Sequence, residues 1–271
     1  MTDLRPDDHP WHRGLRFAWK KINGLEGYWT WPEGLESRPE DKGNTDVTAV
    51  KVALGKDHSA RFELELSYHP PSEPPALTEK RTISVSAPDK NGSYQIEWCS
   101  VFTAGVEGAV LDRTPILGEP DGMPWGGYAG MQLRVAKREN LAAWTLLNSE
   151  GIKIANKMDA DVAEQKKSLE QAHGKPARWL DLTLDFTSGK RAGVTLFDHP
   201  GNLRYPAAWH VSSLPNELIQ TPLFQGPYTL EAGKTLTFRF RIQVHSGEAD
   251  KILLENQWKE FASLDTKQFV P

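Results

Sequence analysis

The chain has a single cysteine, Cys99, among its 271 residues. An internal disulfide is therefore excluded. Cys99 lies within the strand-like segment 94–104, which predicts a buried, inert thiol rather than a nucleophile. The first residues contain no apolar stretch of the kind that a secretory signal needs. We therefore expect a soluble, cytoplasmic protein.

Long hydrophobic runs and a strong charge bias are also missing. No apolar segment approaches the roughly 18 to 20 residues that a membrane helix needs. The 32 Lys and Arg residues nearly balance the 36 Asp and Glu residues, so the formal net charge is −4. This balance does not indicate nucleic acid or an anionic membrane surface as a partner. A small molecule is the expected partner, and the oligomeric state is left open.

Several catalytic signatures are absent. The chain contains no Gly-x-Ser-x-Gly nucleophile elbow, no glycine-rich phosphate loop and no His-Glu-x-x-His metal motif. No repeat of fixed period is visible either, which argues against a solenoid or a propeller. Any chemistry must therefore come from residues that are brought together by the fold.

The dominant pattern that is present is the alternation of apolar and polar residues. Between residues 60 and 69, Phe62, Leu64 and Leu66 alternate with polar side chains. This period predicts half-buried strands. The same pattern recurs at 80–88, 93–104, 130–136, 142–148, 178–187, 192–198 and 234–245. We therefore expect one all-β domain over residues 1–271, built as an antiparallel sandwich or barrel of about ten or more strands.

Two helices interrupt the strand pattern. Residues 159–175 contain few apolar side chains and predict an exposed surface helix inserted between strands. Residues 247–264 predict a C-terminal helix. Its apolar residues are expected to dock on the sheet, and these are Ile252, Leu253, Trp258 and Phe261.

Half of the eight histidines lie in two short segments that resemble each other. Residues 7–14 read DDHPWHRG and residues 197–210 read FDHPGNLRYPAAWH. Each contains Asp-His-Pro, a later arginine, and a second histidine near a tryptophan. Polar residues at the ends of strands commonly build functional sites. We predict that the two segments meet in one pocket; the alternative is two turns whose polar side chains cap the backbone.

The residue types in these segments suit acid–base chemistry. An aspartate orients an imidazole, which then serves as a general acid or base near neutral pH. Arginine stabilises negative charge as it develops on a substrate. The candidate catalytic residues are Asp8, His9, His12, Asp198, His199 and His210. The candidate substrate-binding residues are Trp11, Arg13, Tyr128, Asn202, Arg204 and Trp209.

Several segments resemble the bacterial family known as methane oxygenase PmoA. They include DHPWHRGLRFAW, GGYAGMQLR, GVTLFDHPGNLRYPAAWHV and LEAGKTLTFRFRIQVHSGEAD, and the resemblance covers nearly the whole chain. The name cannot be literal, because the methane oxygenase subunit is an integral membrane protein. The genes near family members imply a place in carbohydrate catabolism. Relatives usually carry further strands before the first Asp-His-Pro, so the start is either short or incomplete.

The closing segment, 231–245, also resembles galactose-mutarotase-like proteins. That resemblance implies a large antiparallel β-supersandwich, with a jelly-roll sandwich as the alternative. It also implies sugar binding by His, Arg, Trp and carboxylate side chains on one sheet face.

Together, these observations predict a carbohydrate-processing enzyme that acts on a sugar or an oxidised (keto) sugar, as an epimerase, lyase or hydrolase. Trp11 and Trp209 would stack on the sugar ring, and Arg13 and Arg204 would bind an oxyanion. One alternative is a non-catalytic sugar-binding or regulatory protein. The other is an enzyme that depends on a divalent metal, the one cofactor considered, with ligands drawn from His9, His12, His199 and His210.

Overall fold

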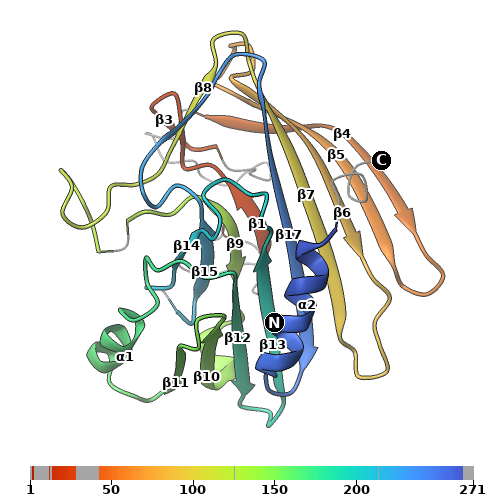
Figure 1. Ribbon diagram of the computed structural model, residues 1–271, viewed down its shortest axis with the longest axis vertical. Coiled ribbons are helices and arrows are strands. Elements are labelled where there is room, and N and C mark those ends of the chain that lie inside the picture. Colours follow the sequence, from red (N-terminus) through yellow and green to blue (C-terminus); the bar gives the residue numbers. More distant parts are fainter. Residues whose placement is uncertain are drawn as a thin grey trace.

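The computed structural model describes residues 2, 12, 14–28, 43–124, 126–212 and 214–264. In this part of the chain, 17 strands form three sheets, accompanied by two α-helices and one short 3-10 helix, η1 (Arg138–Asn140). The strands within every sheet pair antiparallel (Figure 1). The predicted all-β antiparallel sandwich with small helical insertions is confirmed.

The largest sheet has nine strands in the order β11-β10-β12-β13-β17-β7-β6-β5-β4. Their bounds are β4 (Asn44–Leu54), β5 (Ala60–His69), β6 (Leu77–Val85), β7 (Tyr94–Ala104), β10 (Leu141–Asn148), β11 (Lys153–Lys157), β12 (Trp179–Phe186), β13 (Arg191–Asp198) and β17 (Thr235–Ser246). The central strand β17 places Phe238, Phe240 and Ile242 on one face, where all three are buried. This face is the inner face of the sandwich.

Two four-stranded sheets complete the fold. The first, which we call the small sheet, has the order β1-β9-β15-β14 and comprises β1 (Leu15–Ala18), β9 (Gly130–Arg134), β15 (Glu217–Thr221) and β14 (Ala208–His210). The other has the order β16-β8-β2-β3 and comprises β16 (Tyr228–Leu230), β8 (Ala109–Asp112), β2 (Lys21–Ile22) and β3 (Leu25–Glu26).

The small sheet packs against the inner face of the large sheet (Figure 1). The ring of Phe17 on β1 lies 5.2 Å from Phe102 and 5.5 Å from Phe238, centroid to centroid. Each large side chain buried in this way stabilises the fold by about 1.5–3 kcal/mol. Side chains alternate across a strand, so residues next to Phe17, such as Arg16, point to the opposite face of the small sheet.

The inserted helix α1 (Val162–Leu169) is shorter than the predicted 159–175. It begins after Asp161, whose carboxylate accepts hydrogen bonds from the backbone N–H groups of residues 163 and 164, as an N-cap does. Gln165 and Leu169 are buried, so one side of the helix packs on the protein. The helix is therefore only partly exposed.

The C-terminal helix α2 (Lys251–Ala262) packs on the outer face of the large sheet. Leu254 and Phe261 are its buried residues, and they join Cys99, Trp179 and Phe197 in a second, smaller core. The prediction that Ile252 and Leu253 dock on the sheet is wrong, because they are 76% and 55% exposed. The face of the helix that packs on the sheet is instead the one that carries Leu254 and Phe261, which are seven residues apart.

The buried position of Cys99 confirms the expected inert thiol. Burial also raises the pKa of this thiol, which disfavours the reactive thiolate. Among the described residues, the two helices are too short and too polar to cross a membrane.

Candidate functional site

The small sheet presents a polar face on the side away from the core. In its register, Arg16 lies opposite Gln132, and Glu217 lies opposite Arg134. His210 lies opposite Ile219, which in turn lies opposite Gln132. Directly opposed residues share a face, and so do alternate residues along a strand. We call the set His12, Arg16, Gln132, Arg134, His210 and Glu217 the polar layer.

Glu217 holds the polar layer together. One of its oxygens accepts a short hydrogen bond from Arg16 Nη2, which also donates to Gln132 Oε1 at 2.5 Å. The other oxygen lies 3.6 Å from His12 Nδ1. The side chains of Glu217 and Arg16 are only 10% and 16% exposed, so this ion pair is largely removed from water. Three distant parts of the sequence thus meet at one carboxylate.

The surrounding cations keep Glu217 ionised. Burial by itself would raise the pKa of this carboxyl group, but Arg16 and then His12, Arg134 and His210 hold the pKa below its ordinary value. Burial works in the opposite sense on Arg16 and lowers its pKa, which the carboxylate of Glu217 counteracts. Arginine keeps its charge under such conditions. At neutral pH the layer therefore holds an ionised acid among positively charged groups.

Two N–H donors of the layer have no hydrogen-bond partner among the described residues. They are Nη1 of Arg16 and Nε2 of Gln132, and both atoms are buried. Gln132 is 2% exposed. Buried donors in native proteins are nearly always satisfied, and leaving one unsatisfied costs about 1–3 kcal/mol. A small molecule with two acceptor oxygens would satisfy both.

His210 connects the polar layer to a second group of side chains. Its Nε2 lies 3.2 Å from the hydroxyl oxygen of Ser212. Its ring packs edge-on against His173, with centroids 4.9 Å apart, and Tyr128 lies 5.9 Å away. Tyr128, a predicted binding residue, therefore lies beside His210. This group could relay a proton between Ser212 and the layer.

His173 is the neutral member of this group. Burial, and secondarily the neighbouring His210, lowers its pKa to about 4. Its Nδ1 accepts a hydrogen bond from the backbone N–H of Val211 at 3.3 Å. The ring proton therefore lies on Nε2, which is a hydrogen-bond donor.

The other half of the second Asp-His-Pro segment makes a different set of contacts. The carboxylate of Asp198 accepts hydrogen bonds from Asn202 Nδ2 at 2.8 Å and from the backbone N–H of Ala207 at 2.9 Å. Asn202 in turn exchanges two hydrogen bonds with the backbone of Arg239 on β17. Burial raises the pKa of Asp198 to about 7 despite these bonds. These two residues fasten the turn to the large sheet.

His199 lies beneath helix α2. Its ring packs edge-on against Phe261 at 5.2 Å, and its Nδ1 accepts the backbone N–H of Gly201 at 3.0 Å. Burial, followed by the nearby Arg239, lowers its pKa. The contacts described for Asp198, His199 and Asn202 lead to α2, β17 and the local turn rather than to the polar layer.

Arg204 and Trp209 are held by backbone carbonyls. The guanidinium of Arg204 donates to the carbonyl oxygens of Pro222, Gly226 and Pro227 at 3.2, 2.6 and 2.8 Å. Trp209 is 1% exposed, and its indole N–H donates to the carbonyl of Ala177 at 2.9 Å. The register places Trp209 on the core side of the small sheet, opposite to His210.

Within the described residues, the second histidines of the two segments share one neighbour, Glu217, and the prediction that the segments form one pocket stays a prediction. His12 and His210 both act on Glu217, one as a neighbour at 3.6 Å and the other electrostatically. The remaining predicted residues of the first segment lie outside the described residues, and they are Asp8, His9, Trp11 and Arg13.

Four members of the polar layer are not among the site residues predicted from the sequence: Arg16, Gln132, Arg134 and Glu217. A signal was present in segments 14–20 and 130–136, where polar residues recur at every second position between apolar ones. Segment 130–136 is predicted as a half-buried strand, which would turn Gln132 and Arg134 to solvent, whereas segment 14–20 is not predicted as a strand. Segment 216–221 was not predicted as a strand, so Glu217 had no place in the pattern.

The described part of the chain contains no group of three or more His, Cys, Asp or Glu side chains arranged to hold a metal ion. One of the histidines of the metal hypothesis, His9, lies outside that part. The metal-dependent alternative therefore stays a prediction.

The chain belongs to the DUF6807 family, described as a family of unknown function, whose profile matches residues 1–259. No curated protein matches it. A solved structure titled "Putative kojibiose phosphorylase from human microbiome" is 10% identical, with a TM-score of 0.32. The match covers 84% of this chain and 26% of that one, so the chain spans about a quarter of that protein's length. The resemblance to the methane oxygenase PmoA family stays a prediction.

Proposed function

We propose that the polar layer binds the acidic or oxidised end of a small carbohydrate and carries out acid–base chemistry on it. The observation that supports this most strongly is the convergence of Arg16, Arg134, His12, His210 and Glu217 on one largely buried face. Clusters of titratable groups with shifted pKa values are typical of functional sites.

The charge of the layer favours an anionic ligand. Two arginines face a single carboxylate, so the layer carries excess positive charge even with both histidines neutral. Within the polar layer, Arg16 Nη1 and Gln132 Nε2 are buried donors that lack a partner among the described residues. Planar donors of this kind match the two oxygens of a carboxylate, or a keto oxygen with its neighbouring hydroxyl. A uronic acid or a keto-sugar offers such oxygens.

His210 is the residue that we assign as the acid–base group, with His12 as its counterpart. Glu217 is ionised, and a carboxylate beside an imidazole stabilises the imidazolium that forms when the ring accepts a proton. His210 would take the proton from the carbon next to the carboxylate or keto group. The electron pair of that C–H bond would move onto the oxygen, where Arg16 and Gln132 stabilise the charge.

The fate of this intermediate defines the reaction. Return of a proton to the same carbon from the opposite side gives epimerisation. Departure of a substituent from the next carbon gives elimination, with the leaving oxygen taking a proton. Both outcomes agree with the epimerase or lyase types predicted from the sequence, and neither requires an oxidant.

Exchange of the carbon-bound proton with solvent deuterium tests this proposal. The protein would be incubated in D2O with D-glucuronate, D-galacturonate and 3-keto-glucose, and the loss of each proton signal followed by NMR. We expect exchange or turnover of at least one sugar. General acid–base groups contribute about 10²–10⁴-fold, so His210→Gln should slow it by roughly a hundredfold or more.

The matched variant is His199→Gln, which changes the other candidate histidine of the same segment. We expect it to retain the exchange rate within a few-fold. Loss of exchange in His199→Gln with retention in His210→Gln would overturn the assignment. Binding of a sugar without any exchange would identify a non-catalytic sugar-binding protein instead.

A further inference from the structure

A pocket of about 860 Å³ lies between helix α1, the segment 116–126 and the segment 212–224. Ligand pockets typically have volumes of about 300–1,000 Å³ and are lined mainly by apolar side chains with a few polar groups. The apolar lining here comprises Ile116, Leu117, Met123, Pro124, Val162, Leu169, Leu214 and Phe224. The pocket therefore suits an apolar body far larger than a single sugar ring.

The wall of this pocket is held in place by close packing. A Cβ atom added to Gly127 or Gly174 would come within 2.7 Å of the Phe224 ring. Both glycines also have positive φ, of +88° and +69°, which other residues adopt with strain. The position of the Phe224 ring thus depends on two glycines from separate segments.

Two residues of the pocket lining contact His210 of the polar layer. Ser212 and His173 both line the pocket, and both contact His210. A ligand in the pocket would lie against the Ser212 hydroxyl and the edge of the His173 ring. Ser212 and His173 would then connect its polar end to His210, while its apolar body contacts α1.

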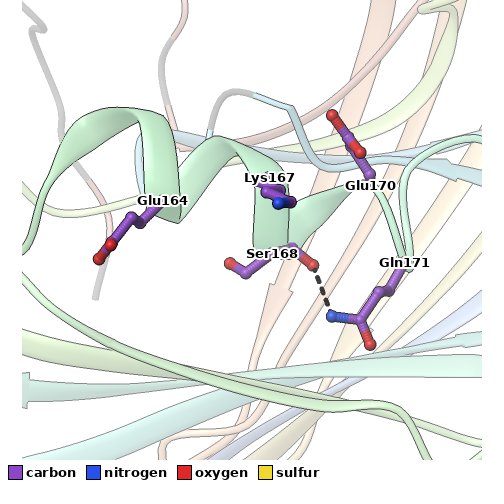
Figure 2. Close-up of a pocket in the computed structure, with 5 residues that line it drawn as sticks. All are labelled: Glu164, Lys167, Ser168, Glu170 and Gln171. Carbon is purple, nitrogen blue, oxygen red and sulfur yellow. Dashed lines mark hydrogen bonds between the residues drawn. The ribbon is translucent and has the colours of Figure 1, made fainter.

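A second hollow, beside α1 and the turn that follows it, lacks these features (Figure 2). Its five lining residues are all polar, and they are Glu164, Lys167, Ser168, Glu170 and Gln171. The hydrogen bond drawn there joins Gln171 Nε2 to the backbone carbonyl of Ser168, within the turn that ends the helix. Of the two hollows, the apolar pocket is therefore the one whose lining residues contact the candidate acid–base group, His210.

We propose that the apolar pocket binds an aromatic aglycone, so that the substrate class is a glycoside of an acidic or oxidised sugar. This inference rests on the proposed function for the sugar end. The aromatic nature of the aglycone is inferred from two rings in the pocket lining, His173 and Phe224, which pack edge-on against each other with centroids 5.7 Å apart and offer a surface against which a further flat ring can pack. For a 3-keto glycoside, loss of the proton from C2 with departure of the aglycone from C1 is the elimination described above. In a uronide that elimination removes the substituent on C4 instead, and the aglycone stays in place.

Calorimetric titration with two probes, D-glucuronate and phenyl β-D-glucuronide, tests the inference. Burial of a phenyl ring predicts that the glucuronide binds the natural protein at least about tenfold more tightly. Val162 lines the pocket at the start of α1 and is 59% exposed, so Val162→Trp can fill the pocket without disturbing the core. In this variant the preference for the glucuronide should fall below about threefold, with glucuronate affinity unchanged.

Val106→Trp is the matched control, because Val106 is also an exposed valine, at 93%, and lies outside the pocket lining. It should keep the full preference. Equal affinities of the natural protein for both probes would overturn the aglycone pocket and leave the proposed function standing. If neither probe binds, the proposal for the sugar end fails, and titration with phenol then tests the pocket alone. Phenol binding that is abolished by Val162→Trp would support the pocket, and the absence of phenol binding would overturn it.

Discussion

Replacement of Glu217 by glutamine is the perturbation that most strongly probes the polar layer. The change keeps the size of the side chain and removes the charge that Arg16, Arg134 and His12 surround. Arg16 would remain in place, largely buried, without its ion-pair partner. The effect on stability can be estimated from that burial.

Removal of one partner from a buried ion pair costs about 3–5 kcal/mol, chiefly because the other charge stays buried. The side chains of Arg16 and Glu217 are 16% and 10% exposed, so partial solvation places this pair at the lower end of that range. We therefore expect Glu217→Gln to lower the free energy of unfolding by about 3 kcal/mol. A loss of this size is a large part of the 5–15 kcal/mol typical of a folded domain.

Urea unfolding at neutral pH, followed by tryptophan fluorescence, measures this loss. Glu248→Gln is the control, because Glu248 also pairs with a cation, Lys153 at 2.9 Å, but is 56% exposed. Exposed pairs contribute little, so this variant should unfold nearly as the natural protein does. The double variant Arg16→Met with Glu217→Leu removes both charges and should recover most of the stability, while losing uronate binding.

The pH dependence provides a second readout. The pKa of Glu217 is lowered in the folded protein, so its stabilising effect is present above its ordinary value of 4.5 and is lost as the pH falls through the folded value. The difference between the natural protein and Glu217→Gln should therefore shrink in acid. An unfolding midpoint of Glu217→Gln equal to that of the natural protein at pH 7 would refute the reasoning.

Two further predictions concern side chains outside the layer. Burial alone would lower the pKa of His245, but the hydrogen bond to Asp181 raises it above the ordinary value of 6.5. The pair therefore stabilises the fold fully below pH 6.5, and this stabilisation is lost as the pH rises through the pKa of the folded protein. Urea unfolding should show a lower free energy of unfolding at pH 9 than at pH 6, and His245→Gln should remove this contribution to the difference. Arg204→Ala should lower the free energy of unfolding by about 1–3 kcal/mol, because three backbone carbonyls within 222–227 lose their hydrogen-bond donor. The affinity for glucuronate, measured by calorimetry, should stay the same. A drop in affinity with unchanged stability would instead identify Arg204 as a substrate-binding residue.

Strands buried on one face were predictable because local alternation specifies them. Segment 60–69 was predicted as a strand and forms β5 with those bounds. Strand β4, residues 44–54, was missed because it lies at the edge of the sheet, where nearly all of its side chains are exposed and alternation carries no signal. Local patterns therefore describe the interior of this fold better than its margins.

The candidate site depends on register, which local sequence does not contain. Arg16 and Glu217 are 201 residues apart and meet only because β1 and β15 both pair with β9. The Asp-His-Pro motif, by contrast, was visible in the sequence. In the structure, its Asp198 accepts hydrogen bonds from its own turn and from Asn202. The sequence could not reveal this, because a carboxylate that caps a turn and one that orients a catalytic histidine can have the same local sequence.

The central claim is that the two buried donors of the polar layer bind the oxygens of an acidic sugar. A crystal structure of the protein soaked with D-glucuronate measures this most directly. The proposed site predicts the carboxylate of the sugar within hydrogen-bond distance of Arg16 Nη1 and Gln132 Nε2, on the His210 side of the small sheet. A glucuronate bound instead beside Asp198 and His199, with the polar layer unchanged, would contradict it.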